Sequence, residues 1–255
     1  MSRVRVAVTL LTCCIMALTP NALAAQPTLD PTFSNDGKLV LRATTKSDVT
    51  DVEVHGGDVY AAGWSFESEF RQMMMTRVNT AGELDTGFGR DGFAFAFPGD
   101  SLFGTGLTVD SDGGVLVVGQ SAGRSTVARL TASGHRDLAF SGNGYKTLPA
   151  AGTKLAFPPD LVIDSVGRII VGATVVSRHG FDVHLYRLLP NGDRDSSFSG
   201  DGVRTIDFSQ HDWMDALAVD SRDRVILGTD VESSQHPNAP STIIRLRRNG
   251  TFDAT

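Results

Sequence analysis

The chain has 255 residues, of which 20% are charged and 41% hydrophobic, and its formal net charge at pH 7 is −6. An acidic chain without a basic run is a poor partner for nucleic acid or for anionic lipid. The chain is long enough to bury a core that stabilises it without disulfide bonds.

The first 24 residues have the features of a secretory signal peptide. Arg3 and Arg5 precede an apolar run over residues 6–18, and small residues at Ala22 and Ala24 fit the positions that signal peptidase reads. We therefore predict cleavage after Ala24 and a protein that is secreted, periplasmic or held at the cell surface.

Two other interpretations of this segment fit its residues less well. An uncleaved anchor would need about 20 apolar residues, and this run is shorter and is followed by Pro20. A lipoprotein would need a small residue before Cys13 or Cys14, the two cysteines of the chain, and Thr12 precedes Cys13. After cleavage, we expect neither a cysteine nor an integral membrane segment in residues 25–255.

One motif recurs along residues 25–255. An Arg at the end of an apolar run is followed by Gly five residues later, Asp eight later, Phe eleven later and a second Gly fifteen later. The three full copies are Arg77/Gly82/Asp85/Phe88/Gly92, Arg129/Gly134/Asp137/Phe140/Gly144 and Arg187/Gly192/Asp195/Phe198/Gly202; Arg245/Gly250/Asp253 starts a further copy, and Asp30/Phe33/Gly37 lacks the Arg. Such regular spacing indicates a repeated structural unit.

The segments between successive motifs have the pattern of short β-strands. In the second unit, residues 93–97 alternate with period two, and residues 107–109, 115–118 and 126–130 are short apolar runs rich in β-branched residues. The turn at 110–114 is dense in Asp and Gly. The other units follow the same plan, and no window has a capped helical period. We predict an all-β fold with four strands in each unit.

The length of the unit decides the architecture. The distance from one motif Asp to the next is 52–58 residues, which is typical of one four-stranded blade of a β-propeller. We therefore predict a β-propeller-like domain over residues 25–255, with four repeats that are each a four-stranded antiparallel meander.

The repeats also resemble a known family. Residues 29–38 and 84–89 look like the delta-60 repeat of bacterial secreted proteins, as do residues 187–192 and 216–220. The resemblance implies a propeller-like β fold and a family without an assigned activity, so it supplies no functional residues. Two of the turns, at 164–167 and 220–223, lack the usual Asp-Gly pair.

The sequence does not decide whether the four units close into a ring. Asp30 and Asp253 hold the same position of the motif, so in a four-unit ring they would compete for one place. The end of the motif could fray, another chain could complete the ring, or the chain could be part of a longer protein. We expect a closed or nearly closed single ring.

The repeated charges favour a structural role. We predict ion pairs such as Arg77 with Asp85 and Arg187 with Asp195, with the motif Phe as an apolar plug between units, because a group that recurs in every unit is a buttress rather than a site. Gly119-Gln120-Ser121-Ala122-Gly123 matches a nucleophile elbow, but it leads into another strand instead of a helix, so we interpret it as a hairpin exit.

Metal ligands are not indicated clearly. Asp110-Ser111-Asp112-Gly113 resembles the start of a calcium loop, yet position twelve is Ser121 and not Glu, and the same residues favour a tight turn. The six histidines show no zinc spacing. Asn249-Gly250-Thr251 matches a glycosylation acceptor but occupies a repeated turn. We assign no catalytic, cofactor-binding or metal-binding residue.

The segments in which the repeats differ are the better candidates for function. Residues 64–70, 209–213 and 230–240 vary between units, and propeller loops carry binding residues on a rigid scaffold. We predict an exported binding or interaction module without catalytic activity, whose unknown protein or carbohydrate ligand binds these loops. The alternatives are a propeller-type hydrolase, lactonase or lyase with a polar or metal cluster at the channel mouth, and a subunit or piece of a larger repeat protein.

Overall fold

The computed structural model describes residues 28–43, 46–67, 70–96, 101–149, 155–156, 159–178, 180–208, 211–232 and 241–254, and the strands in this part account for its regular structure. The signal-peptide prediction for residues 1–24 lies outside the described residues. In the described part of the chain, no helical segment reaches the length and apolarity that a membrane crossing needs.

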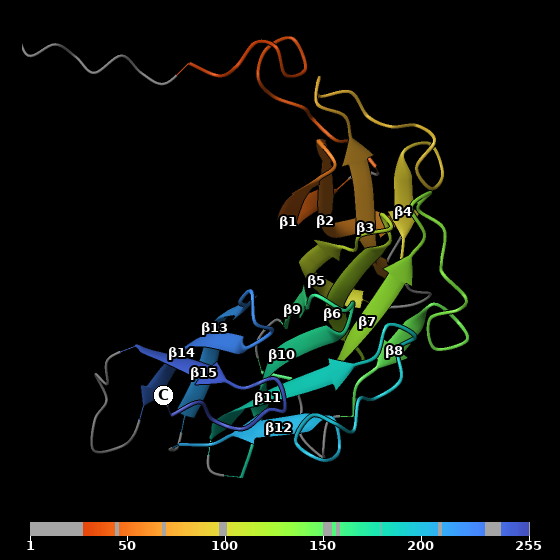
Figure 1. Cartoon of the computed structure of the whole chain (residues 1–255). Helices are drawn as coiled ribbons and strands as arrows, with labels where there is room; N and C mark the ends of the chain where they lie inside the picture. Colours follow the sequence, from red (N-terminus) through yellow and green to blue (C-terminus); the bar gives the residue numbers. More distant parts are fainter. Residues whose placement is uncertain are drawn as a thin grey trace, which may run out of the picture.

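The strands follow one another as short antiparallel meanders (Figure 1). They are β1 (Ser47–His55), β2 (Asp58–Glu67), β3 (Phe70–Val78), β4 (Phe93–Phe95), β5 (Ser101–Val109), β6 (Val115–Ser121), β7 (Arg124–Leu130), β8 (Tyr145–Thr147), β9 (Asp160–Ile163), β10 (Ile169–Val176), β11 (Phe181–Leu188), β12 (Val203–Ile206), β13 (His211–Val219), β14 (Val225–Glu232) and β15 (Thr242–Leu246). The predicted all-β class is confirmed.

Each sheet takes its strands in chain order. The first sheet is β1-β2-β3-β4 and the second is β5-β6-β7-β8. The third is β9-β10-β11-β12, and β13-β14-β15 form the fourth, which joins the third through a single parallel pair between Phe181 and His211. The strand after each full copy of the motif, such as β4 after Gly92, therefore closes the sheet that precedes that copy. The sequence had not decided at which strand each blade begins and ends.

The cores lie between successive sheets. Met73, Met75 and Phe88 of the first sheet pack with Leu107 and Val117 of the second. Corresponding clusters join the second sheet to the third and the third to the fourth. Each sheet is thus apolar on both faces and is stabilised by its neighbours, as expected for a repeat that cannot bury its surface alone. The motif residues Phe88, Phe140 and Phe198 are at most 1% exposed, which confirms their predicted role as plugs.

The motifs also link each unit to the next through the backbone. Gly89 N donates to Ser133 O at 2.8 Å, and Ser141 N donates to Asn191 O at 2.8 Å. Ser199 N repeats the bond with Asn249 O, and Ser34 N makes the equivalent bond with Ala81 O at 2.7 Å. The first motif, which lacks its Arg, therefore lies against the first sheet as each of the three full motifs lies against the sheet that follows it.

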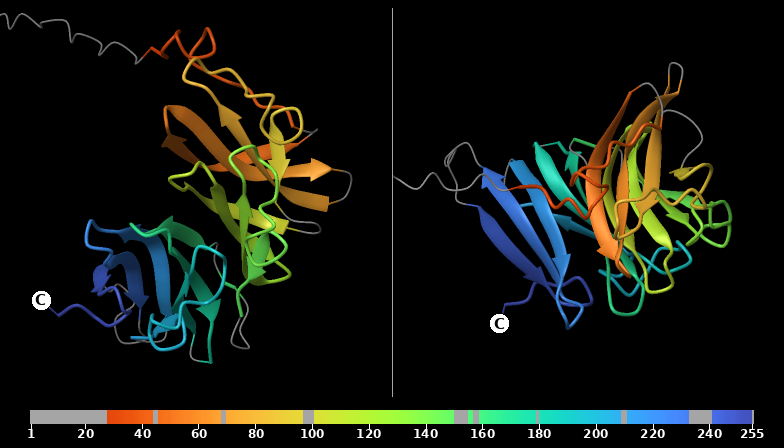
Figure 2. Two further views of the ribbon diagram at one scale, coloured as in Figure 1. Left: turned by 45° about the vertical axis from the view of Figure 1, so that its right-hand side comes forward. Right: turned by 90° about the horizontal axis from the view of Figure 1, so that it is seen from above.

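The four sheets form an open arc and not the closed or nearly closed ring that we expected from the sequence (Figures 1 and 2). The first sheet and the fourth lie at the two ends of the arc. Closure would need a strand beside the outer edge of β15, and β14 is its only partner among the described strands. The two positions that were expected to compete are separate, because Asp253 lies beside Arg245 while Asp30 bonds to its neighbour Thr32.

Candidate functional site

The connections between strands lie along two rims of the arc, one at each end of the strands. Because the strands of each meander alternate in direction, the first hairpin turn of a sheet and its motif lie at one end of the strands. The second hairpin and the link to the next sheet lie at the other end. The repeated residues therefore occupy one rim, which we call the motif rim. The segments that differ between repeats occupy the other, which we call the loop rim.

The described residues of the predicted variable segments lie at the loop rim and belong to strands. Residues 64–67 extend β2 and Phe70 begins β3, so this segment is a long hairpin around residues 68–69, which the structure does not describe. Residues 211–213 begin β13 and residues 230–232 end β14. Residues 209–210 and 233–240 lie outside the described residues.

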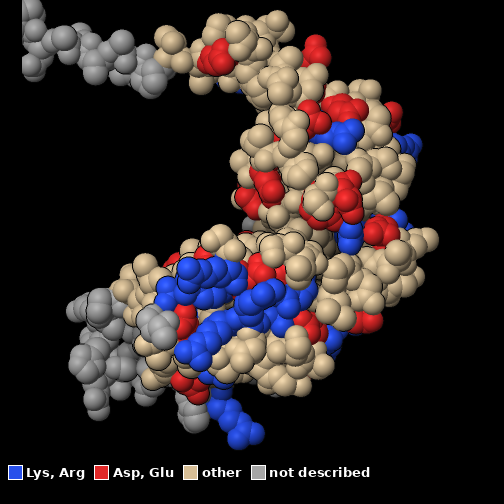
Figure 3. Space-filling view, viewed as in Figure 1, with Lys and Arg blue, Asp and Glu red and all other residues tan. Residues whose placement is uncertain are grey.

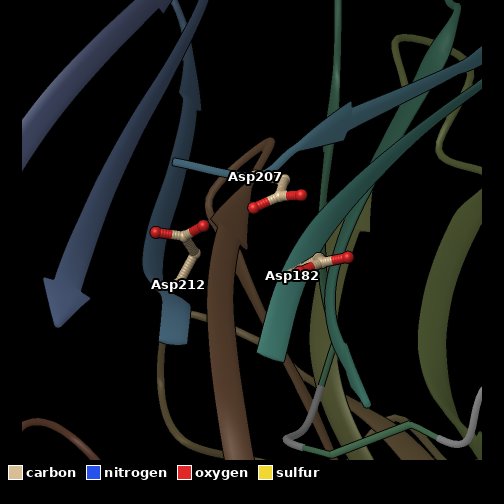
Figure 4. A group of neighbouring side chains, drawn as sticks. All are labelled: Asp182, Asp207 and Asp212. Carbon is tan, nitrogen blue, oxygen red and sulfur yellow. The ribbon is translucent and has the colours of Figure 1, made fainter. Parts of the chain in front are cut away.

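Three carboxylates meet at the loop rim between the third and fourth sheets (Figure 4). Asp182 is near the start of β11, Asp207 follows β12, and Asp212 is near the start of β13. One carboxylate oxygen of each lies within 4.8 Å of the others, a spacing that could hold a hard cation such as calcium. Asp212 is fully buried and accepts a hydrogen bond from Phe208 N at 2.7 Å, which fixes its carboxylate.

Aromatic side chains from the same two sheets lie next to these carboxylates in the chain. The rings of His211 and Trp213 are stacked, with centroids 5.4 Å apart and an interplanar angle of 13°. Phe181 lies against both rings, at 5.2 Å from His211 and 5.6 Å from Trp213. Because successive residues of a strand point to opposite faces of the sheet, these rings lie on the face opposite the carboxylates of Asp182 and Asp212.

A second aromatic group lies on the long hairpin of the first sheet. Trp64 and Phe66 meet edge to face at 5.5 Å, with the Arg71 guanidinium 4.9 Å from the Trp64 ring centroid and Lys46 at 5.8 Å. Trp64 is only 9% exposed, so these rings stiffen the hairpin against its own strands. Trp64, which belongs to the predicted variable segment 64–70, is therefore used in packing.

The predicted ion pairs of the motif are confirmed, and each reaches further than expected. Arg77 Nε lies 2.7 Å from Asp85 Oδ2, and Arg187 Nε lies 2.8 Å from Asp195 Oδ2. The same Arg77 also donates to Ala132 O of the next unit at 3.0 Å. Arg129 donates to Pro190 O at 3.0 Å, and Arg187 donates to Arg248 O. Each arginine therefore fastens its own motif to the turn of the following unit.

The electrostatics of these pairs fit their structural role. Burial alone would raise the pKa of Asp195, but hydrogen bonds from Ser197 and the Arg187 charge outweigh it and lower that pKa. For Asp85, the hydrogen bond from Arg77 is the largest influence, and its pKa is also lowered. Both carboxylates thus stay ionised beside their arginines, and neither is poised to exchange protons near neutral pH.

Two motifs that the sequence singled out are turns, as predicted. Gly119 and Ser121 lie within β6, and Ala122 and Gly123 form the hairpin to β7 with φ of 49° and 75°. The Asp110 carboxylate accepts from Gly114 N at 2.8 Å and from Arg129 at 2.6 Å. The two Asp110 oxygens that a calcium ion would need as ligands are therefore already used in the turn and in the ion pair.

Figure 3 shows a basic patch that the overall acidity of the sequence does not suggest. Lys and Arg side chains gather over the end of the arc that holds the fourth sheet. Two arginines of the fourth sheet are paired with acids: Arg224 lies 2.6 Å from Asp220, and Arg248 lies 2.9 Å from Asp223. The positive charge of such paired arginines is partly neutralised by the carboxylates beside them.

A cavity between the second and third sheets is too small for a ligand. It is lined by Arg124, Ser125, Leu148 and Tyr186 among others and has room for about one water molecule. The Tyr186 hydroxyl donates to Pro149 O at 2.8 Å, and burial raises the pKa of Tyr186 to about 12.

The comparisons with known proteins agree with this architecture. Residues 89–124 match a family described as a beta-propeller repeat, and residues 167–198 match a beta-propeller domain of unknown function, DUF5122. Both matches support a β-propeller repeat family. No curated protein matches the chain.

Two solved structures resemble the chain at low sequence identity. A beta-1,3-galactosidase of glycoside hydrolase family 43 has a TM-score of 0.45 and 13% identity, and covers 76% of this chain and 42% of its own. A candidate hydrolase from Bacteroides ovatus has a TM-score of 0.37 and 14% identity, with 76% and 57% covered. The chain thus spans about half the length of these proteins. Both TM-scores are below 0.5, so the fold assignment rests on the sheets and on the two repeat matches.

Proposed function

We propose that the chain is an exported binding module without catalytic activity, and that its ligand docks at the loop rim between the third and fourth sheets. The observation that carries the proposal is the meeting of Asp182, Asp207 and Asp212, from two sheets, where the repeats differ. Phe181 and Trp213 contact each other at the same strand ends. Repeated residues of the motif rim are used in ion pairs and plugs, and the loop rim is free to vary without loss of the scaffold.

The chemistry of this group fits a carbohydrate. Carboxylates accept hydrogen bonds from sugar hydroxyls, and aromatic rings pack against the apolar faces of sugar rings. A calcium ion held by the three carboxylates would also coordinate sugar hydroxyl oxygens. We also infer that the repeats are of the delta-60 type and that residues 1–24 direct export; both remain proposals drawn from the sequence.

Calorimetric titration of residues 25–255 with a panel of neutral oligosaccharides, with and without calcium, tests the proposal. We expect Asp182→Asn and Asp207→Asn to weaken binding about tenfold or more, because each removes a charge-assisted hydrogen bond worth about 1.5–3 kcal/mol. Asp91→Asn is the matched control, since Asp91 is 94% exposed on the motif rim. Equal binding by all variants, or no heat with any sugar, would rule the proposal out.

A second candidate is a propeller-type hydrolase, lactonase or lyase that uses the same cluster. It is favoured by the convergence of three acids from two different sheets, because such an enzyme requires a polar cluster of this kind. Turnover of the same oligosaccharides that is abolished by Asp207→Asn would replace the binding module with this enzyme. Binding without turnover would retain the module.

A further inference from the structure

The fourth sheet has an exposed apolar face that the other sheets cover. Ile243 precedes the motif Arg245 by two positions, as Met75, Val127 and Leu185 precede their own motif arginines. Those three side chains are at most 1% exposed, because the next sheet packs on them, but Ile243 is 81% exposed. The outer edge of β15 is also not paired with any described strand.

The first sheet has the complementary exposed face. Val52 pairs with Ala61 of β2 at the register position that Leu107, Leu161 and Leu217 hold in the later sheets. Those leucines are at most 8% exposed, because the preceding sheet packs on them. Val52 is 61% exposed and Val54 is 69% exposed.

The segment before β1 has the register of a fourth strand but no sheet to complete. Residues 38–41 follow Gly37 as β4 follows Gly92 and as β12 follows Gly202. Leu41 corresponds to Ala96, Leu148 and Ile206, which are buried, and it is only half-buried itself. Residues 38–43 pair with no strand in the part of the chain that the structure describes.

We propose that the fourth sheet of one copy of this chain binds the N-terminal end of a second copy, head to tail. Inside the chain, every junction consists of a sheet, the motif, an outer strand and the inner strand of the next sheet. Residues 30–54 supply the last three parts without a sheet before them, and β13-β14-β15 supply a sheet without the outer strand. The three internal junctions thus define which surface fits this face.

The arc itself favours a second copy over closure within one chain. The exposed faces of β1 and β15 belong to opposite ends of the arc and are separated by its open side (Figures 1 and 2). A heterologous contact of this kind closes into a ring of two or more copies when the rotation permits. It also covers an exposed strand edge, which folded proteins otherwise protect from association.

The internal junctions give the expected contacts. Ala96 N donates to Met73 O and Leu148 N donates to Ser125 O, four residues before the motif Arg in each case. We therefore expect Leu41 N of the donor copy to bond with Ser241 O of the acceptor, and Val52 to pack on Ile243.

Light scattering on residues 25–255 over a range of concentrations tests this proposal independently of any ligand. We expect a dimer or larger closed assembly. Ile243→Glu and Val52→Glu place a charge in the two halves of the contact at positions that are exposed in one copy, so each variant should still melt cooperatively but have monomer mass. Val166→Glu is the control: Val166 is 57% exposed on a motif-rim turn, and this variant should keep the wild-type mass.

Mixing the two variants tests the head-to-tail geometry. Each retains one intact half of the contact, so a mixture of Ile243→Glu and Val52→Glu should give a one-to-one complex that neither forms alone. A monomer at every concentration of the wild-type chain would show that the exposed faces are not joined between copies. Self-association that survives in both single variants, or a mixture that stays monomeric, would equally overturn the proposal.

Discussion

Arg187 and Asp195 form an ion pair in which both side chains are nearly buried, at 3% and 8% exposed, with Nε and Oδ2 2.8 Å apart. The same guanidinium reaches Arg248 O of the fourth sheet and lies 4.7 Å from the centroid of the Phe198 ring. One arginine thus joins its own motif, its aromatic plug and the next unit.

Replacement of this arginine should therefore be costly. Arg187→Ala leaves the Asp195 carboxylate buried without its partner, and we expect the free energy of unfolding in urea to fall by about 3–5 kcal/mol. Arg90→Ala is the control, because Arg90 and Asp91 are more than 90% exposed and 4.0 Å apart, and it should change stability by about 0.5 kcal/mol or less. A loss below about 1 kcal/mol in Arg187→Ala would contradict the role of the pair.

The aromatic plugs should account for much of the cohesion between sheets. Phe198 is fully buried between the third and fourth sheets, so Phe198→Ala removes its contacts and leaves a cavity. We expect a loss of about 3–5 kcal/mol in urea unfolding. Phe252→Ala, at a position that is 38% exposed, should cost clearly less. Similar losses in both variants would mean that the buried Phe198 contributes no more to stability than the partly exposed Phe252.

The sequence predicted the parts of the fold that repeat. The positions of the strands, the Arg187–Asp195 pair and the hairpin after Ser121 all follow from patterns that recur in register. The open arc could not be predicted, because it depends on whether residues 38–41 pair with β15, and the spacing of the motif is the same in either case.

The candidate site was predicted only as a region. The sequence placed function in segments that vary, including residues 209–213, but it gave no sign that Asp182 and Asp207 would meet Asp212. These acids come from three strand ends in two sheets and recur at no fixed spacing, so only the packing of the third sheet on the fourth brings them together.

Two glycines of the motif rim allow the cost of backbone strain to be distinguished from the cost of a steric contact. Gly192 and Gly142 have φ of 86° and 78°, which an L-residue adopts at a cost of roughly 1 kcal/mol. A Cβ at Gly192 would lie 3.0 Å from the buried Phe140 ring, whereas a Cβ at Gly142 meets nothing within 4 Å. We expect Gly192→Ala to destabilise the fold by about 1–3 kcal/mol more than Gly142→Ala does. Equal losses in urea unfolding would show that the Phe140 ring gives way freely.

Acid should unfold the protein partly through the turns of the motif rim. Hydrogen bonds from the Arg224 side chain and backbone lower the pKa of Asp220 from 3.8 to about 2. A carboxylate whose pKa is lowered by folding contributes its stability above the unfolded value and loses it as the pH falls through the folded value. The urea midpoint should therefore decline as the pH falls from about 4 to about 2.

Asp220→Asn isolates this contribution. The amide cannot titrate, so the variant should be less stable than the wild type at neutral pH, and the difference should shrink as the pH approaches about 2. Asp91→Asn is again the control, since the exposed Asp91 side chain has a partner only at 4.0 Å, and its difference from the wild type should stay small at every pH. A difference for Asp220→Asn that is constant with pH would place the acid sensitivity in other carboxylates.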